Sequence, residues 1–265
     1  MTRVRLDVSD HIATVQLDRP PHNVFDSRAQ EELYDTAHHL ARRADVRAVV
    51  IRGHRSFSSG ADIEELRGMD HTRMLLHVRA QQEAFTAVAE IPQPVLAALS
   101  GYALGAGCEL ALCADARIAS RTALLGLPEI HLGIIPGGGG TQRLARLIGP
   151  ARAKGMICTG RTLRADEALR VGLVDEVVPT GDLDSRALVW AREMAAGPQL
   201  ALRAAKEVID RGVETDLSTG LALERAAFSN LFATEDRATG LASHLENGPR
   251  QARFHPVRPT APRPS

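Results

Sequence analysis

The sequence predicts an α/β fold whose chain ends in a helical part. The chain opens with strands, a helix and a further strand, an order that implies parallel pairing. Short apolar strands then alternate with helical segments as far as residue 178, and the segments from residue 182 onward carry helical patterns only. We therefore divide the chain into a core of residues 1–197, a helical part of residues 198–247 and a tail of residues 248–265.

The opening segment predicts a β-hairpin followed by a helix and a strand. Residues 4–8 and 12–17 alternate apolar with polar side chains around a turn, which is the pattern of two antiparallel strands. From Ser27, a residue type that caps helices, apolar side chains recur at helical spacing up to Ala41. The apolar run of residues 48–51 predicts the next strand.

The middle of the chain alternates turns, helices and buried strands. The loop of residues 53–63 ends in a predicted helix start at Asp62, and the turn of residues 101–107 leads into a helix that carries Glu109. The predicted strands are residues 95–99, 116–120 and 123–125. Residues 71–90 predict an amphipathic helix whose inward side chains are Met74, Leu75, Val78, Phe85 and Val88.

The remainder is predicted to be mainly helical. Helices are expected over residues 141–147, 150–158, 164–171, 182–196, 199–211, 215–231 and 235–246, with one strand at residues 174–178. The tail from Gly248 holds five of the 14 prolines and no acidic residue. Because such a segment buries little apolar surface, we expect a mobile or draped tail.

Composition narrows the possible partners. The 32 basic and 32 acidic residues give a net charge of zero, so no overall field favours nucleic acid or an anionic membrane. Three cysteines without a C-x-x-C pair suggest neither a disulfide framework nor a zinc site. The N-terminus lacks the apolar stretch of a signal peptide, and the uncharged run of residues 91–108 is interrupted by prolines and glycines. We expect a cytoplasmic protein that spans no membrane.

Two glutamates stand out because each is the only charged residue in a long apolar and glycine-rich stretch. Glu109 is alone between Glu90 and Asp115, and Glu129 is alone between Arg121 and Arg143. Burying an unpaired carboxylate costs several kcal/mol or forces its protonation. Each is therefore either half of a structural salt bridge, or one of a pair in which one carboxylate gives a proton and the other takes one.

The glycine-rich turns match no familiar nucleotide or nucleophile motif. The third glycine of a dinucleotide-binding G-x-G-x-x-G would fall at Leu110, and the glycines of residues 137–140 precede Thr141 rather than a phosphate-binding lysine. No G-x-S-x-G or H-E-x-x-H occurs. The turns before Ala61 and Ala106 each supply a backbone N–H at a helix start, where two donors could form an oxyanion hole. The alternative is that these glycines only allow tight turns and close packing.

Four segments in order carry a family resemblance. They are FSSGADI at residues 57–63, SGYALGAGCEL at residues 100–110, PEI at residues 128–130 and GIIPGGGGTQRL at residues 133–144. Together they resemble the crotonase (enoyl-CoA hydratase/isomerase) superfamily, and the match runs to about residue 247.

The resemblance implies a spiral of repeated ββα units and a helical C-terminal part that builds a homotrimer, commonly stacked in pairs as a hexamer. It also implies that an acyl-CoA thioester binds with its carbonyl oxygen between the N–H groups of Ala61 and Ala106. No metal or redox cofactor is expected, since CoA is part of the substrate. The residues expected along the CoA and the acyl thioester are Val24, Ser59, Asp62, Ile63, Leu104, Gly105 and Pro128.

Members that resemble the hydratases carry both glutamates, so the resemblance implies addition of water to a 2-enoyl-CoA. Glu109 would position and deprotonate the water, and Glu129 would deliver a proton to Cα. The rival readings are a double-bond isomerase or specialised dehydratase of the same superfamily, an RNA-binding protein, and a non-catalytic CoA-binding or assembly subunit. An isomerase would need Glu129 alone, and the zero net charge counts against RNA.

Three positions depart from the superfamily pattern. Residues 23–26 read Asn-Val-Phe-Asp where many relatives have Asn-Ala-Leu. Ala106 stands where hydratases often have glycine, which keeps the N–H but crowds the pocket. The segment of residues 254–257 lacks a closing basic residue that could contact a CoA phosphate.

Overall fold

A six-stranded sheet in the order β1-β2-β3-β4-β6-β9 supports the core of the protein in the computed structural model, which describes residues 2–254. The hairpin strands β1 and β2 are antiparallel, and every other neighbouring pair is parallel. The predicted hairpin and parallel opening are thus confirmed. The strands are β1 (Val4–Ser9), β2 (Ile12–Leu17), β3 (Ala48–Arg52), β4 (Val95–Leu99), β6 (Ala116–Ser120) and β9 (Glu176–Val178).

A second sheet of three short strands lies beside the first. Its order is β5-β7-β8, with β5 parallel to β7 and β7 antiparallel to β8. The strands are β5 (Tyr102–Leu104), β7 (Leu124–Gly126) and β8 (Thr162–Arg164). The sequence did not predict β5 and β8. Each has only three residues, which is too short for an alternating pattern to stand out from the neighbouring turns.

The chain visits the two sheets in turn and so winds as a spiral. β4 in the large sheet is followed by β5 in the small sheet and then by α4 (Ala106–Ala111). One turn later, β6 and β7 are followed by the short 3-10 helix η1 (Glu129–Leu132). In the preceding turn, Ser58 after β3 forms an isolated parallel bridge with Ala103 of β5. These steps are the repeated ββα units that the family resemblance implied.

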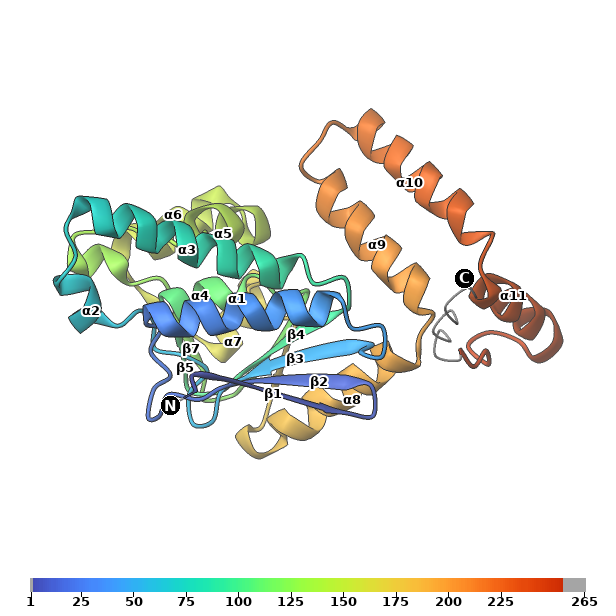
Figure 1. Ribbon diagram of the computed structural model, residues 1–265, viewed down its shortest axis with the longest axis horizontal. Coiled ribbons are helices and arrows are strands. Elements are labelled where there is room, and N and C mark those ends of the chain that lie inside the picture. The colour runs from blue at the N-terminus through green and yellow to red at the C-terminus, as the bar shows by residue number, and fades with distance from the viewer. Residues whose placement is uncertain (1, 255–265) are drawn as a thin grey trace, which may run out of the picture.

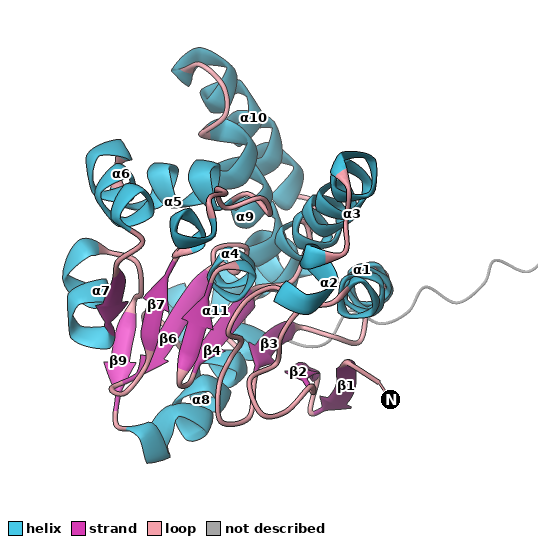
Figure 2. Ribbon diagram, turned by 90° about the vertical axis from the view of Figure 1, so that its left-hand side faces the viewer, coloured by secondary structure: helices cyan, strands magenta, loops and turns pink. Residues whose placement is uncertain are grey.

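Helices cover both faces of the large sheet (Figure 2). Successive residues of β3 alternate between the faces, as a pleated strand requires. Val49 and Ile51 join the larger apolar cluster with α1, α3 and α4, whereas Val50 joins the smaller cluster against α8. The helices are α1 (Ser27–Ala41), α2 (Ile63–Arg67), α3 (His71–Ala89), α5 (Gly140–Ile148), α6 (Pro150–Thr159), α7 (Ala165–Val171), η2 (Thr180–Asp182), α8 (Leu183–Ala196), α9 (Gln199–Gly212), α10 (Leu217–Leu231) and α11 (Glu235–Asn247).

The last three helices extend away from the sheet (Figure 1). α8 packs against β3 and the neighbouring strands, but α9, α10 and α11 bury only Gln199 among their described residues. Their bounds agree with the predicted helices within two residues. No helix described in residues 2–254 is long and apolar enough to cross a membrane.

The described part of the tail contacts α11. Residues 248–254 contain neither helix nor strand. The ring of Phe254 lies beside Gly240 of α11, where an added Cβ would be 3.7 Å from the ring. The rest of the predicted tail, residues 255–265, lies outside the described residues.

The inward face of α3 differs from the prediction. Leu75 is 60% exposed, and the buried stripe of the helix runs instead through His77, Gln81, Phe85 and Val88. The apolar pattern failed because two polar residues, His77 and Gln81, occupy inward positions where polar partners lie within reach. His77 contacts Ser27 and Gln30 of α1, and Gln81 points toward Glu109.

Arg117 ties β6 to the segment before β9. Its side chain is 5% exposed, and its guanidinium donates to the carbonyl oxygens of Leu173, at 2.9 Å, and Ala114, at 2.7 Å. Asp175 accepts from the backbone N–H of Arg117 at 2.7 Å. This buried cation supplies hydrogen-bond donors to two buried carbonyl groups.

We expect Arg117→Met to lower the free energy of unfolding by about 2–4 kcal/mol, because two buried carbonyl oxygens lose their donors. Arg5→Met is the matched control, since Arg5 is 69% exposed and its ion pair with Asp18 should contribute less than about 1 kcal/mol. Urea unfolding of both variants measures the difference. Equal losses would contradict the role given to Arg117.

Candidate active site

Glu109 lies on the short buried helix α4 and is held by the glycine-rich segment that leads into α5. Its side chain is 1% exposed. The Oε1 atom accepts hydrogen bonds from the N–H groups of Gly138 and Gly140, each at 2.8 Å. The Oε2 atom lies 3.5 Å from the amide nitrogen of Gln81 on α3, a long and weak contact. Glu109 is therefore fixed through one oxygen and has acceptor capacity left on the other.

The glycines of this loop are required by the approach of the carboxylate. A Cβ on Gly138 would lie 2.8 Å from Glu109 Oε2, and a Cβ on Gly140 would lie 3.0 Å from Oε1. Any side chain at these two positions would push the loop off the carboxylate. The glycine run is thus the partner of Glu109 rather than a phosphate-binding loop.

Glu129 begins η1, directly after Pro128, which precedes the first turn of that helix. Its Oε2 atom is buried and has no hydrogen-bond partner among residues 2–254. Its Oε1 atom lies beside Gly105, where a Cβ would come within 3.0 Å. Gly105 therefore lets this carboxylate approach the start of α4.

Burial raises the pKa of both carboxyl groups. The pKa of Glu109 rises to about 7, chiefly through loss of solvation and further through the charge of Glu129, while the N–H groups of Gly138 and Gly140 oppose the rise. The pKa of Glu129 is also raised by burial. Neither glutamate forms a salt bridge among the described residues, so the structural ion-pair reading is wrong. Groups of this kind can exchange protons near neutral pH.

The N–H groups of Ala61 and Ala106 are placed where they can serve an external acceptor. Ala106 is the first residue of α4, so its N–H has no partner within the helix. Ala61 forms an isolated parallel bridge with Phe25. The N–H of Phe25 donates to the carbonyl of Gly60, and the carbonyl of Phe25 accepts from the N–H of Asp62, both at 2.8 Å. In this parallel bridge the N–H of Ala61, which lies between those two groups, points away from Phe25.

The two turns that carry these donors pack against each other. Ser58 donates to the carbonyl of Tyr102 at 2.8 Å and accepts from the N–H of Leu104 at 3.0 Å. A Cβ on Gly60 would lie 3.7 Å from the nitrogen of Ala106. The spiral therefore brings together Ala61, Ala106 and Glu129, which the sequence separates by up to 68 residues.

The remaining predicted contact residues lie around this centre. Leu104 ends β5 and Gly105 follows it, so both border α4 and Glu129. Ser59 donates its N–H to the carbonyl of His22 at 2.9 Å, next to Val24 in the first crossover. Ile63 is 50% exposed at the start of α2.

Asp62 uses its carboxylate within the protein. Oδ1 accepts from the N–H groups of Glu64 and Glu65 and thereby caps α2, while Oδ2 forms an ion pair with Arg19 at 2.6 Å.

Sequence reasoning did not single out Arg19 or Gln81. For Gln81 a signal existed, since a polar residue stands four positions before Phe85 on the inward stripe of α3. No group of three or more His, Cys, Asp or Glu residues suited to a metal ion occurs in the described part of the chain.

The sequence profile of the enoyl-CoA hydratase/isomerase family matches residues 7–255. The chain belongs to that family. YngF of Bacillus subtilis is 41% identical to this chain over 241 residues, and the match covers 90% of this chain and 93% of YngF. The short-chain-enoyl-CoA hydratase of Clostridium acetobutylicum is 37% identical over 249 residues, covering 93% of this chain and 95% of its own.

Solved structures place the fold in the same family. The crystal structure of enoyl-CoA hydratase from Bacillus anthracis superposes with a TM-score of 0.91 at 38% identity, covering 96% of this chain and 99% of that chain. The predicted superfamily and its spiral α/β fold are confirmed by these matches.

We expect Glu109→Gln to change the pH dependence of stability of this family member. The unfolded carboxyl ionises around its ordinary pKa of 4.5, but the folded one holds its proton up to about pH 7, so wild-type stability falls as pH rises through this window. Relative to the wild type, the variant should gain about 2 kcal/mol between pH 5 and pH 8. Urea unfolding at both pH values measures this gain, and a constant difference would refute the raised pKa.

Proposed function

We propose that this chain is an enoyl-CoA hydratase, which adds water across the 2,3 double bond of a 2-enoyl-CoA to form a 3-hydroxyacyl-CoA. The observation that carries the proposal is the pair of buried carboxylates whose pKa values are both raised, beside two backbone N–H groups free to bind an oxygen. The relative from Clostridium acetobutylicum and the solved structure from Bacillus anthracis are both enoyl-CoA hydratases by name, which supports the proposal.

In the proposed mechanism the thioester carbonyl oxygen binds between the N–H groups of Ala61 and Ala106. These donors stabilise the negative charge that develops on the oxygen, an effect worth about 3–4 kcal/mol for one donor in other enzymes. The polarised double bond then becomes electrophilic at C3. Val24, Ser59 and Ile63 would lie along the CoA, and the backbone near Asp62 would complete that surface.

The two glutamates would transfer the protons that addition of water requires. Ionised Glu109, held through Oε1, accepts a proton from the water through Oε2 as the C3–O bond forms. Protonated Glu129 then gives its proton to C2 as the enolate charge returns from the thioester oxygen. The proton on Glu109 must pass back to Glu129 before the next turnover, and the two groups titrate as a coupled pair. The reaction balances with water and protons alone, so it needs no electron acceptor.

Double-bond isomerisation is the second candidate. It is favoured by the state of Glu129, whose buried Oε2 atom lacks a partner among the described residues and could move a proton between two carbons by itself. Such a reaction would not require Glu109. The same variants therefore separate the two candidates.

We predict that Glu109→Gln and Glu129→Gln each lower kcat for hydration of crotonyl-CoA by about 10²–10⁴, the usual contribution of a general acid or base. Loss of the enoyl absorbance measures the rate. Glu83→Gln is the matched control, because Glu83 is exposed on α3 and its carboxylate pairs with Arg79 of the same helix, so the rate of this variant should equal that of the wild type. An inert wild type would refute the hydratase proposal. A 3-enoyl-CoA that Glu109→Gln still isomerises would favour the isomerase.

We also propose that the chain self-associates through its C-terminal helices, as a trimer or as two stacked trimers. Apolar side chains cover α9, α10 and α11 without packing on the described core, more than a monomer usually exposes. These side chains are Leu200, Ile209, Leu217, Leu221, Phe228, Phe232, Leu241 and Leu245.

The buried Cys108 and Cys113 are free thiols, which supports a reducing, cytoplasmic location.

We expect light scattering of the wild type to give three or six times the chain mass of 28.5 kDa. Phe228→Asp should lower this mass, because Phe228 is 62% exposed on α10 and a charge there would have to be buried in the assembly. Leu169→Asp on α7, where Leu169 is 42% exposed, is the control that should leave the mass unchanged. A monomeric wild type would refute the assembly.

A further inference from the structure

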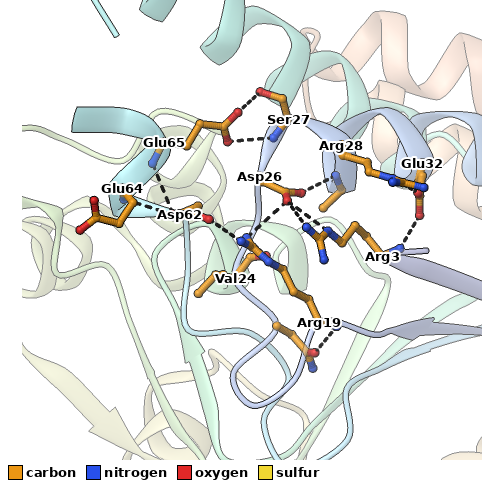
Figure 3. A network of polar contacts seen from close by, with 12 residues as sticks. Arg3, Arg19, Val24, Asp26, Ser27, Arg28, Glu32, Asp62, Glu64 and Glu65 are labelled. Carbon is orange, nitrogen blue, oxygen red and sulfur yellow. Dashed lines mark hydrogen bonds and ion pairs between the residues drawn. The ribbon is translucent and has the colours of Figure 1, made fainter. Parts of the chain in front are cut away.

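Arg19 lies between the N-terminal ends of α1 and α2 (Figure 3). One guanidinium nitrogen lies 2.6 Å from Asp62 at the start of α2, and the other lies 3.5 Å from Asp26 at the start of α1. The second nitrogen also donates to the carbonyl of Val24 at 3.3 Å. The Arg19 side chain is 25% exposed, so these ion pairs are only partly screened by solvent.

Each aspartate divides its two oxygens between a helix and Arg19. Asp26 caps α1 with Oδ1, which accepts from Ala29 at 2.8 Å, and turns Oδ2 to Arg19. Asp62 caps α2 with Oδ1 and likewise turns Oδ2 to Arg19. The guanidinium thus joins two helix caps, and its hydrogen bond lowers the pKa of Asp62.

Ala61 directly precedes Asp62, the residue that Arg19 binds at the start of α2. Backbone hydrogen bonds from Phe25 to Gly60 and from Asp62 to Phe25 hold the residues on both sides of Ala61. One turn further, Glu65 accepts from the backbone N–H of Ser27 at 3.0 Å and from its hydroxyl at 2.6 Å. Ala61 is therefore the unpaired donor within a segment that is tied down on either side.

We propose that Arg19 is a positioning residue, which holds the Ala61 N–H at the thioester oxygen by joining the caps of α1 and α2. The inference rests on the proposed hydratase function. Without Arg19, Asp62 loses its cation while Asp26 keeps Arg3, so the ion-pair link between the two caps is lost. The start of α2, together with the adjacent Ala61, is then no longer held to the start of α1 by this link. Displacement of an aligned group by about 1 Å can cost about 10²-fold in rate.

The test compares Arg19→Met, Asp62→Asn and the double variant in crotonyl-CoA hydration. Asn still caps α2 through its side-chain oxygen but loses the ion pair. Each single variant should lower kcat about 10–100-fold while KM changes less than about threefold, since a transition-state contact is lost. The double variant should lose no more than either single variant, because both changes break the same link. Losses that multiply would overturn the proposal.

Arg3→Met is the matched control. Arg3 contacts the same Asp26 oxygen at 2.9 Å but does not reach Asp62, so kcat should stay within about threefold of the wild type. An equal loss in Arg3→Met and Arg19→Met would show that general support of α1 is at stake, and would overturn the proposal. Arg19→Lys keeps a cation that can reach one carboxylate, and its kcat should be intermediate. If Arg19→Met does not fold, Arg19→Lys and Asp62→Asn decide the question.

A spectroscopic measurement reports on the donor itself. The infrared carbonyl stretch of bound butyryl-CoA, labelled with carbon-13 at the thioester and unable to react, should lie below its value in water for the wild type. In Arg19→Met it should return part of the way, because one of two donors is misplaced. If Arg19→Met shows the same carbonyl frequency and the same hydration rate as the wild type, the positioning role of Arg19 is overturned, and the proposed hydratase function still stands. An unshifted frequency and no hydration in the wild type would instead refute the proposed function.

Discussion

The carboxylate of Glu109, buried on a six-residue helix, is the constraint on which the centre of the molecule depends. Two backbone N–H groups, one from the loop before α5 and one from the first residue of α5, replace part of its lost hydration, and only glycine at positions 138 and 140 leaves room for that contact. The compensation is incomplete, because the pKa of Glu109 still rises to about 7. The fold therefore keeps a carboxyl group that can exchange a proton near neutral pH, at a cost in stability when it is ionised.

The spiral supplies the rest of the geometry. Because β4 and β5, and then β6 and β7, enter different sheets, the chain makes a sharp turn after each of these pairs, and the turns of successive repeats come to lie against each other. The turns at Gly60 and Gly105 meet in this way, and Glu129 reaches the same place from the next repeat. Backbone donors and carboxylates from three repeats thus converge, although only Ala106 and Glu109, both on α4, are close in sequence.

Polar links around the first crossover connect this centre to the surface. Arg19 joins the caps of α1 and α2, and Glu65 joins α2 to Ser27 (Figure 3). His77 of α3 contacts the same serine. By contrast, the C-terminal helices contribute almost no buried residues to the described core and present an apolar surface. The protomer is therefore tightly connected where the proposed chemistry occurs and open where we propose that copies associate.

The sequence by itself determined the long helices, the parallel opening and the two glutamates. Helical spacing over ten or more residues and an isolated charge in an apolar stretch are local signals that survive folding. Only the tertiary structure decided how these parts are completed. The partners of Glu109 lie 29 and 31 residues away, Arg19 meets Asp62 across 43 residues, and β5 and β8 exist only as partners of β7. Leu75 is exposed because His77 and Gln81 find hydrogen-bond partners on other elements. Such long-range contacts leave no periodic trace in the chain, since each depends on where a distant segment folds.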